Sequence, residues 1–238
     1  MRETMIEMRG ISKAFPGVQA LRDCSLEVYQ GEVHALLGEN GAGKSTLMKI
    51  LTGIYQADAG KIVFNGRETK INSVLDARAL GITMIHQELN LLSNLTIAQN
   101  IFISKEIKRH GVFLDERATS AMAAELLERV NLHVDPNTMV SELTVAQQQM
   151  VEIAKAISYN SRVIIMDEPT APLSNSEIES LFAIIGEMKK SGIIVLLTAR
   201  PETIFERVRY SHNRPLIEHN KTVEYICELL EKRREKYE

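Results

Sequence analysis

A glycine-rich segment at residues 38–45 carries the most specific chemistry in the sequence. It reads GENGAGKS and fits the pattern G-x-x-x-x-G-K-[ST], after an apolar run at 33–37 and before a helix-forming run. Glycines allow successive backbone N–H groups to turn inward around phosphate oxygens, and a helix N-terminus adds a favourable field for anions. The residues predicted to bind the phosphates of a nucleotide are Gly38, Asn40, Gly41, Gly43, Lys44, Ser45 and Thr46.

Two of these side chains have distinct expected roles. In a loop of this kind the Lys44 ammonium reaches the β- and γ-phosphates, and the Ser45 hydroxyl is a ligand for Mg²⁺. The alternative without a bound ligand is a flexible glycine turn that precedes an ordinary helix. A strand before the loop and a helix after it both favour the phosphate site.

A pair of carboxylates follows a second apolar run, at 163–166. Asp167 and Glu168 come at the end of this expected buried strand. From there Asp167 holds Mg²⁺ through water, and Glu168 is placed to polarise the attacking water. An Asp-Glu pair after a strand is by itself usually a solvated strand end. Downstream of a phosphate loop, with Pro169 behind it, the pair instead predicts a site that hydrolyses a nucleoside triphosphate.

The elements that position these groups alternate between strands and helices. Short strands are expected near 6–9, 25–29 and 33–37, with a hairpin turn at 65–66 and a further buried strand at 193–197. Because strands alternate with helices, the fold class is α/β.

Residues from about 90 to 160 have a helical pattern. Asp115 is a plausible N-cap, and a helix from 145 to 159 places Ala146, Met150, Ile153, Ala154 and Ile157 on one face. The expected apolar stripe that follows Asp115 consists of Ala118, Met122, Leu126 and Val130.

Composition narrows the class of protein. The 238 residues are 45% hydrophobic and 25% charged with a net charge of −3, so no basic surface argues for nucleic acid. No apolar run approaches the roughly 20 residues that a membrane-spanning helix needs. Cys24 and Cys227 are the two cysteines, and they make neither a disulfide framework nor a metal site. These features favour a reduced, cytoplasmic protein.

The residues between the two motifs resemble one family. LTVAQQQMVEIAK at 143–155 is similar to the signature segment of ABC transporter ATP-binding subunits, in the form typical of the monosaccharide-importer branch. FPGV at 15–18 and IHQEL at 85–89 resemble the same branch. The resemblance covers about residues 1–192 and implies a P-loop NTPase fold. That fold has a mixed sheet flanked by helices, an N-terminal antiparallel β lobe and a helical lobe at about 90–160.

The resemblance also implies roles and partners. Phe15 would stack on adenine, although a core aromatic is the alternative reading. Gln87 would touch Mg²⁺ and the attacking water and transmit to a permease subunit in the inner membrane, although a plain polar loop residue is the alternative. The signature residues Thr144, Ala146 and Gln147 would contact ATP bound to a second nucleotide-binding domain. The implied ligands are ATP and Mg²⁺, and the implied activity is ATP hydrolysis that drives sugar import.

The sequence departs from the family at the end of its last core strand. Ala199 stands where the family has a switch histidine, and loss of one preorganised hydrogen-bond donor slows a reaction by roughly a hundredfold or more. We therefore expect impaired hydrolysis with binding retained. Residues 193–238 instead resemble the lid and C-terminal helix of shikimate kinases and are expected to complete the core, with Arg214 as the lid arginine. Val223, Ile226 and Leu230 would pack on the sheet.

The sequence is compatible with three functions. The first is an ABC-type ATP-binding domain with weak turnover. The second is a small-molecule kinase of the shikimate type, although neither an Asp-x-Asp after the phosphate-loop helix nor a triple glycine is present. The third is a designed or chimeric P-loop protein that folds around nucleotide without a physiological activity.

Overall fold

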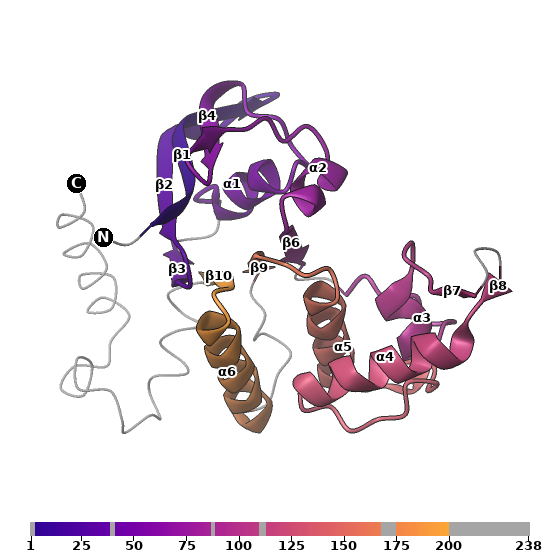
Figure 1. Cartoon of the computed structure of the whole chain (residues 1–238). Helices are drawn as coiled ribbons and strands as arrows, with labels where there is room; N and C mark the ends of the chain where they lie inside the picture. Colours follow the sequence, from indigo (N-terminus) through magenta and orange to yellow (C-terminus); the bar gives the residue numbers. More distant parts are fainter. Residues whose placement is uncertain (1–2, 39–40, 87–88, 110–112, 168–174, 200–238) are drawn as a thin grey trace, which may run out of the picture.

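The computed structural model describes residues 3–38, 41–86, 89–109, 113–167 and 175–199, with the backbone alone at 109, 175–177 and 195–199. Three parts are visible in Figure 1: an N-terminal lobe built on an antiparallel sheet, a parallel core sheet, and a lobe of helices. The expected packing residues Val223, Ile226 and Leu230 lie outside the described residues, as does Arg214.

The N-terminal lobe pairs four strands in the order β2-β1-β4-β5. These are β1 (Thr4–Phe15), β2 (Val18–Tyr29), β4 (Ala59–Phe64) and β5 (Arg67–Glu68), and every pairing is antiparallel. The turn from β4 to β5 is the expected Asn65-Gly66, with φ of 50° and 72° at the two residues. Helices α1 (Lys44–Leu51) and α2 (Val74–Ala79) supply apolar residues to the same core.

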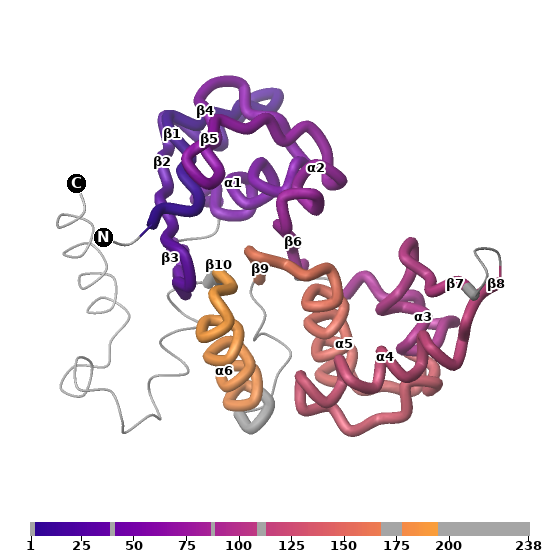
Figure 2. Tube along the Cα trace, in the orientation of Figure 1, coloured from indigo at the N-terminus to yellow at the C-terminus, as the bar shows by residue number. Residues whose placement is uncertain are grey.

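The core sheet is parallel and has the order β3-β10-β9-β6. It consists of β3 (Val33–Leu37), β10 (Ile194–Ala199), β9 (Val163–Asp167) and β6 (Ile82–Ile85). Figure 2 shows β3 and β10 side by side although they are far apart in the chain. Each of the two four-stranded sheets is thus purely parallel or purely antiparallel. The strand contributed by the segment after residue 192 lies in the middle of the core.

Strand β9 separates two hydrophobic cores, and this explains its continuous apolar run. Val163 and Ile165 pack with α1 and the N-terminal lobe, whereas Ile164 and Met166 pack with the helical lobe. All four side chains are 0% exposed. A parallel strand that is covered on both faces needs apolar residues at successive positions rather than at alternate ones. Helix α6 (Asn175–Lys190) adds Leu181, Ile184 and other apolar residues to the second of these cores.

The helical lobe contains α3 (Ile97–Phe102), α4 (Glu116–Arg129), the 3₁₀ turn Val140–Glu142 and α5 (Val145–Ile157). A small hairpin of β7 (Lys108–Arg109) and β8 (Phe113–Leu114) precedes α4. The apolar face expected for α5 is buried as predicted. Asp115 caps α4 as predicted, because its carboxylate accepts a hydrogen bond from the Ala118 N–H at 2.9 Å.

The stripe expected on α4 was partly wrong. Met122 is 46% exposed, and the buried positions are Ala123, Leu126, Leu127 and Val130. A strict four-residue spacing drifts around a helix of 3.6 residues per turn, so the buried face follows alternating steps of three and four.

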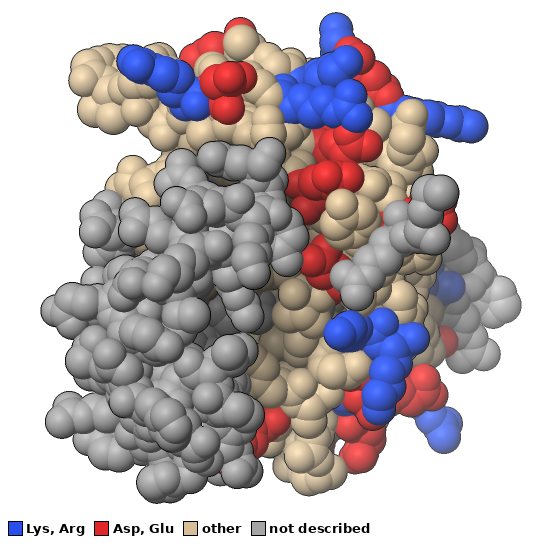
Figure 3. All heavy atoms as spheres, turned by 90° about the vertical axis from the view of Figure 1, so that its left-hand side faces the viewer, with Lys and Arg blue, Asp and Glu red and all other residues tan. Residues whose placement is uncertain are grey.

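Surface charges on one side of the molecule are of both signs. In the view of Figure 3, Lys and Arg side chains lie among Asp and Glu side chains over the described part of that face. This agrees with the small net charge of the chain.

Asn100 in α3 ties the segment before that helix to the helical lobe. The side chain is 1% exposed, and its oxygen accepts from the Leu92 N–H at 2.7 Å. Its amide group donates to the carbonyls of Leu92 and Thr96, each at 3.0 Å. A buried amide with these contacts fixes the chain that follows β6.

We expect Asn100→Ala to lower the free energy of unfolding by about 1–3 kcal/mol, because it removes the hydrogen bonds of a buried amide and leaves the Leu92 N–H without its acceptor. Urea unfolding measures the change. Asn94→Ala, at an exposed turn position six residues earlier, is the matched control and should change stability by less than about 0.5 kcal/mol. Equal effects of the two substitutions would contradict this role for Asn100.

Candidate functional site

The candidate site lies at the edge of the core sheet where three parallel strands end. Leu37 at the end of β3 pairs with Ala199 at the end of β10, and Thr198 pairs with Asp167 at the end of β9. Neighbouring strands are about 4.8 Å apart, so the end of β3 and Asp167 are separated by about 10 Å across the sheet. The phosphate loop begins directly after Leu37. Parallel pairing therefore brings the glycine-rich loop and the strand-end carboxylate to one edge.

Two glycines of the loop have backbones that favour this residue type. Gly41 has φ of 83° and Gly43 has φ of 85°, in the left-handed region. A Cβ at Gly43 would also lie 2.7 Å from the Ala20 carbonyl oxygen and 2.6 Å from the Leu21 side chain. The loop is thus pressed against β2, and only glycine permits this approach.

The start of α1 is arranged to receive an anion. Gly43 is its N-cap and supplies no side-chain hydrogen bond to the helix. The first N–H groups of a helix have no acceptor within the helix, so a phosphate oxygen can satisfy them. Ser45 and Thr46 lie in this first turn. Lys44 is the first helical residue, and its Nζ donates to the Gly38 carbonyl at 2.6 Å, which bends the ammonium back over the loop.

The donor set at this edge fits Mg²⁺ with a triphosphate. Mg²⁺ prefers oxygen ligands, keeps several waters and takes only one or two protein groups when phosphates supply the rest. The Ser45 hydroxyl and the half-buried Asp167 carboxylate are oxygen donors of this kind. No group of three or more His, Cys, Asp and Glu side chains in the described part of the chain forms a metal cage. A cation that is bound mainly by phosphate oxygens does not need such a group of side chains.

Phe15 is half-buried at the end of β1. Its ring packs edge-on against Tyr55, which follows α1, with centroids 5.2 Å apart. Asp58 holds this corner by accepting from the Lys13 ammonium at 2.6 Å and from the Ala14 N–H at 2.7 Å. These two hydrogen bonds lower the pKa of the Asp58 carboxyl. The hairpin tip with Phe15 is thereby fixed to the segment that leaves α1.

The signature segment begins α5 in the helical lobe. Figure 1 shows α5 away from the β3–α1 turn of the same chain. Thr144 is the N-cap, and it forms a capping box with Gln147: the Thr144 hydroxyl accepts from the Gln147 N–H at 3.3 Å, and the Gln147 oxygen accepts from the Thr144 N–H at 2.9 Å. Ala146 is buried. This reciprocal capping was not predicted from the sequence, although the pattern T-x-x-Q indicates it.

Several predicted site residues lie outside the described residues: Asn40 of the loop, Gln87 and Glu168. The segments that lead to them are described. His86 follows β6 directly, and Asp167 ends β9 immediately before residue 168.

A pocket of about 280 Å³ lies along β6 at the opposite edge of the core sheet. Near it Lys105 is half-buried, and its ammonium lies 3.8 Å from the centre of the Tyr159 ring. Burial, together with the charges of Lys155 and Arg78, lowers the pKa of Lys105 to about 8. Sequence reasoning missed this group, because the three cations come from separate segments of the chain.

Comparisons with known proteins agree with the geometry. A family model described as ABC transporter matches residues 21–171, and one described as shikimate kinase matches residues 174–238. The second match therefore includes α6, upstream of the boundary at 192 expected from sequence.

Curated relatives are similar over the first part of the chain. A "putative ribose/galactose/methyl galactoside import ATP-binding protein 3" of Burkholderia ambifaria is 59% identical over 190 residues, which are 79% of this chain and 37% of the relative. The "ribose import ATP-binding protein RbsA" of Clostridium perfringens is 49% identical over 209 residues, 86% of this chain and 41% of the relative. The chain thus spans about two fifths of the length of these relatives.

Solved structures share the fold. The ADP conformation of MJ1267, an ATP-binding cassette of an ABC transporter, superposes with a TM-score of 0.71 at 26% identity, covering 83% of this chain and 81% of that one. A nucleotide-free ATP-binding cassette gives a TM-score of 0.73 at 25% identity, with 86% and 84% covered. No helix in the described ranges has the length and apolar character to cross a bilayer.

Lys44→Ala should lower the affinity for MgATP by at least about a hundredfold, because it removes a charge-assisted contact to the β- and γ-phosphates from a site built around that charge. Isothermal calorimetry measures the affinity. Lys61→Ala, at an exposed position on β4, is the control and should bind as the unsubstituted chain does. Retention of full affinity by the Lys44 variant would contradict the assignment of the loop.

The pKa of Lys105 gives a pH dependence with a definite sign. Its pKa is about 8 in the fold and near 10.5 in the unfolded chain. Between these values the unfolded chain holds more protons, so the contribution of Lys105 to the free energy of unfolding rises with pH from about 8 to 10.5. Lys105→Met should flatten the rise measured by urea unfolding across this window. Lys70→Met, at an exposed site, should leave it unchanged. An identical slope in both variants would contradict the shift.

Proposed function

This chain belongs to the ABC transporter family, and we propose that it binds MgATP as the nucleotide-binding domain of a sugar importer. The observation that carries the proposal is the common edge of β3, β10 and β9, where the phosphate loop and Asp167 meet. The uncapped start of α1 and the Lys44 ammonium folded over the loop support it.

On binding, Lys44 exchanges the Gly38 carbonyl for the β- and γ-phosphate oxygens. The N–H groups at the start of α1 donate to the same phosphates, because they have no acceptor within the helix. Phe15 supports the adenine ring at the corner held by Asp58. Bound Mg²⁺ neutralises part of the phosphate charge. Ser45 and Asp167 are the residues proposed to hold it, together with Gln87.

The proposed transport role follows from relatives whose names specify ribose or galactose import. In that role the domain works in the cytoplasm against a permease of the inner membrane, with Gln87 after β6 as the proposed link. Thr144, Ala146 and Gln147 contact ATP on a second nucleotide-binding domain. The support for this pairing is that α5 begins away from the phosphate loop of its own chain and presents a helix N-terminus, a favourable place for a phosphate.

We further propose that hydrolysis is slow. The backbone of Ala199 ends β10 between the phosphate-loop strand and the Asp167 strand, and the resemblance to ABC ATP-binding subunits puts the switch histidine at this position. Alanine has no group that donates a hydrogen bond to a γ-phosphate or orients a water. Glu168 alone then polarises the attacking water.

Ala199→His should raise the steady-state ATPase rate by at least about tenfold, because a preorganised donor of this kind contributes roughly a hundredfold or more when fully engaged. Phosphate release in the presence of MgATP measures the rate. Ala199→Leu is the size control and should not raise it. Glu168→Gln in the histidine variant should abolish the gain. A high basal rate in the unsubstituted chain would contradict the proposed impairment.

A kinase of the shikimate type is the second candidate. The match of residues 174–238 to the shikimate kinase family model favours it, and β10, which falls within that match, is part of the core sheet. Incubation with MgATP and shikimate separates the two functions. Formation of shikimate phosphate would reverse their order, and release of inorganic phosphate alone supports the ATP-binding domain.

A further inference from the structure

Two cations contact one aromatic ring at the far edge of the core sheet, and a third cation, Lys155, lies near enough to act on one of them. The Arg78 guanidinium carbon, from α2, lies 4.8 Å from the centre of the Tyr159 ring, and the Lys105 ammonium lies 3.8 Å from it. Lys155 lies in the last turn of α5, and Tyr159 follows the end of that helix. Lys105 also donates to the Ser158 hydroxyl. The aromatic face and this hydrogen bond hold the cations in place.

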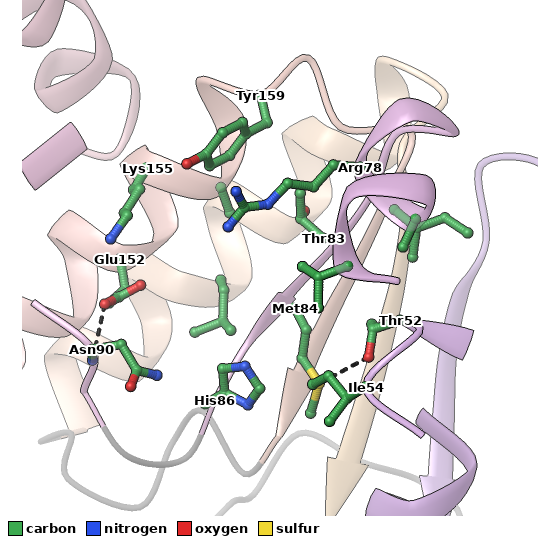
Figure 4. A pocket seen from close by; sticks show the side chains of 15 residues that line it. Thr52, Ile54, Arg78, Thr83, Met84, His86, Asn90, Glu152, Lys155 and Tyr159 are labelled. Atoms are coloured by element: carbon green, nitrogen blue, oxygen red, sulfur yellow. Dashed lines mark hydrogen bonds between the residues drawn. The ribbon is translucent and has the colours of Figure 1, made fainter. Parts of the chain in front are cut away.

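This positive charge is not neutralised within the part of the chain that the structure describes. No ion pair joins Arg78, Lys105 or Lys155 to a carboxylate there. The one carboxylate that lines the pocket, Glu152, accepts from the Asn90 N–H at 3.1 Å. Figure 4 shows it directed toward Asn90 and away from the guanidinium. Burial is the largest cause of the lowered pKa of Lys105, and the charges of Lys155 and Arg78 lower it further.

These side chains line a cavity. Arg78, Lys155 and Tyr159 line the pocket of about 280 Å³. Figure 4 shows the Arg78 guanidinium beside Tyr159 and the Lys155 ammonium directed toward Glu152. Arg78 and Tyr159 also line a neighbouring pocket of about 640 Å³ that includes Arg67 and Arg162. The positive region therefore continues past the Arg78–Tyr159 pair, and every charged group named on it except Glu152 is a cation.

We propose that the pocket beside β6 is a binding site for a phosphate-type oxyanion, held by Arg78 and Lys155 with Tyr159 as the supporting ring. A tetrahedral oxyanion accepts hydrogen bonds from several directions, and a second negative charge matches two or more cations better than a single carboxylate does. The site is distinct from the phosphate loop, because β3 and β6 are the two opposite edge strands of the core sheet. This inference goes beyond the proposed nucleotide binding and does not depend on it.

The test uses the full chain with Lys44→Ala, so that the phosphate loop contributes little. Inorganic phosphate is titrated by calorimetry at constant ionic strength. Arg78→Gln with Lys155→Gln should weaken binding at least about tenfold, since each lost charge-assisted hydrogen bond is worth that much or more. The matched control, Arg22→Gln with Lys61→Gln, removes two exposed cations elsewhere and should bind as its parent does. All four substitutions are at surface positions, and unfolding midpoints verify the fold.

Two further binding measurements determine which class of ligand the site prefers. Acetate at equal concentration should bind at least about tenfold more weakly than phosphate; equal binding would overturn the assignment to a phosphate-type oxyanion. Vesicles of phosphatidylglycerol, compared with phosphatidylcholine, identify a lipid headgroup as the source if binding to them needs Arg78 and Lys155. The proposal is overturned if neither phosphate nor anionic vesicles bind, or if the paired variant and its control bind equally.

Discussion

The parallel pairing of β3, β10 and β9 is the constraint on which the candidate site depends. It brings the start of the phosphate loop, Asp167 and the backbone of Ala199 to one edge, although they are far apart in the sequence. Strand β9 can hold this position because its side chains are buried on both faces, against the N-terminal lobe on one side and the helical lobe on the other. Displacing β9 would expose both cores, so the geometry at the strand ends is protected by a large apolar burial.

The core sheet combines strands from the two segments of the chain that match different family models. One of the two inner strands of the sheet, β10, lies in the segment matched by the shikimate kinase model, whereas β3 and β9 lie in the segment matched by the ABC transporter model. A parallel strand of Ile, Val and Leu packs between two similar strands whatever its ancestry, because the core requires apolar bulk and a regular backbone ladder. The packing of such a strand does not determine the side chain at its end, and the proposed slow hydrolysis rests on Ala199 at that position.

Much of this was predictable from the sequence, because the decisive signals are local. The phosphate loop, the strand that ends at Asp167, the turn at Asn65 and the apolar face of α5 all follow from short patterns of residue type. The buried face of α4 was misplaced at Met122, since a four-residue spacing only approximates the helical period. The hydrogen bonds of Asn100 and the cations around Tyr159 were not predictable, because they join elements whose proximity only the folded chain defines. Gln87 and Glu168 stay predictions.

The central claim is that this edge of the sheet binds a magnesium-bound nucleoside triphosphate. The most direct measurement is a titration of the unsubstituted chain with MgATP, followed by calorimetry and by thermal unfolding. A saturable heat should appear, and nucleotide at a hundredfold excess over its dissociation constant should stabilise the fold by about 2.7 kcal/mol. Folded protein that shows neither heat nor stabilisation at saturating MgATP would contradict the account.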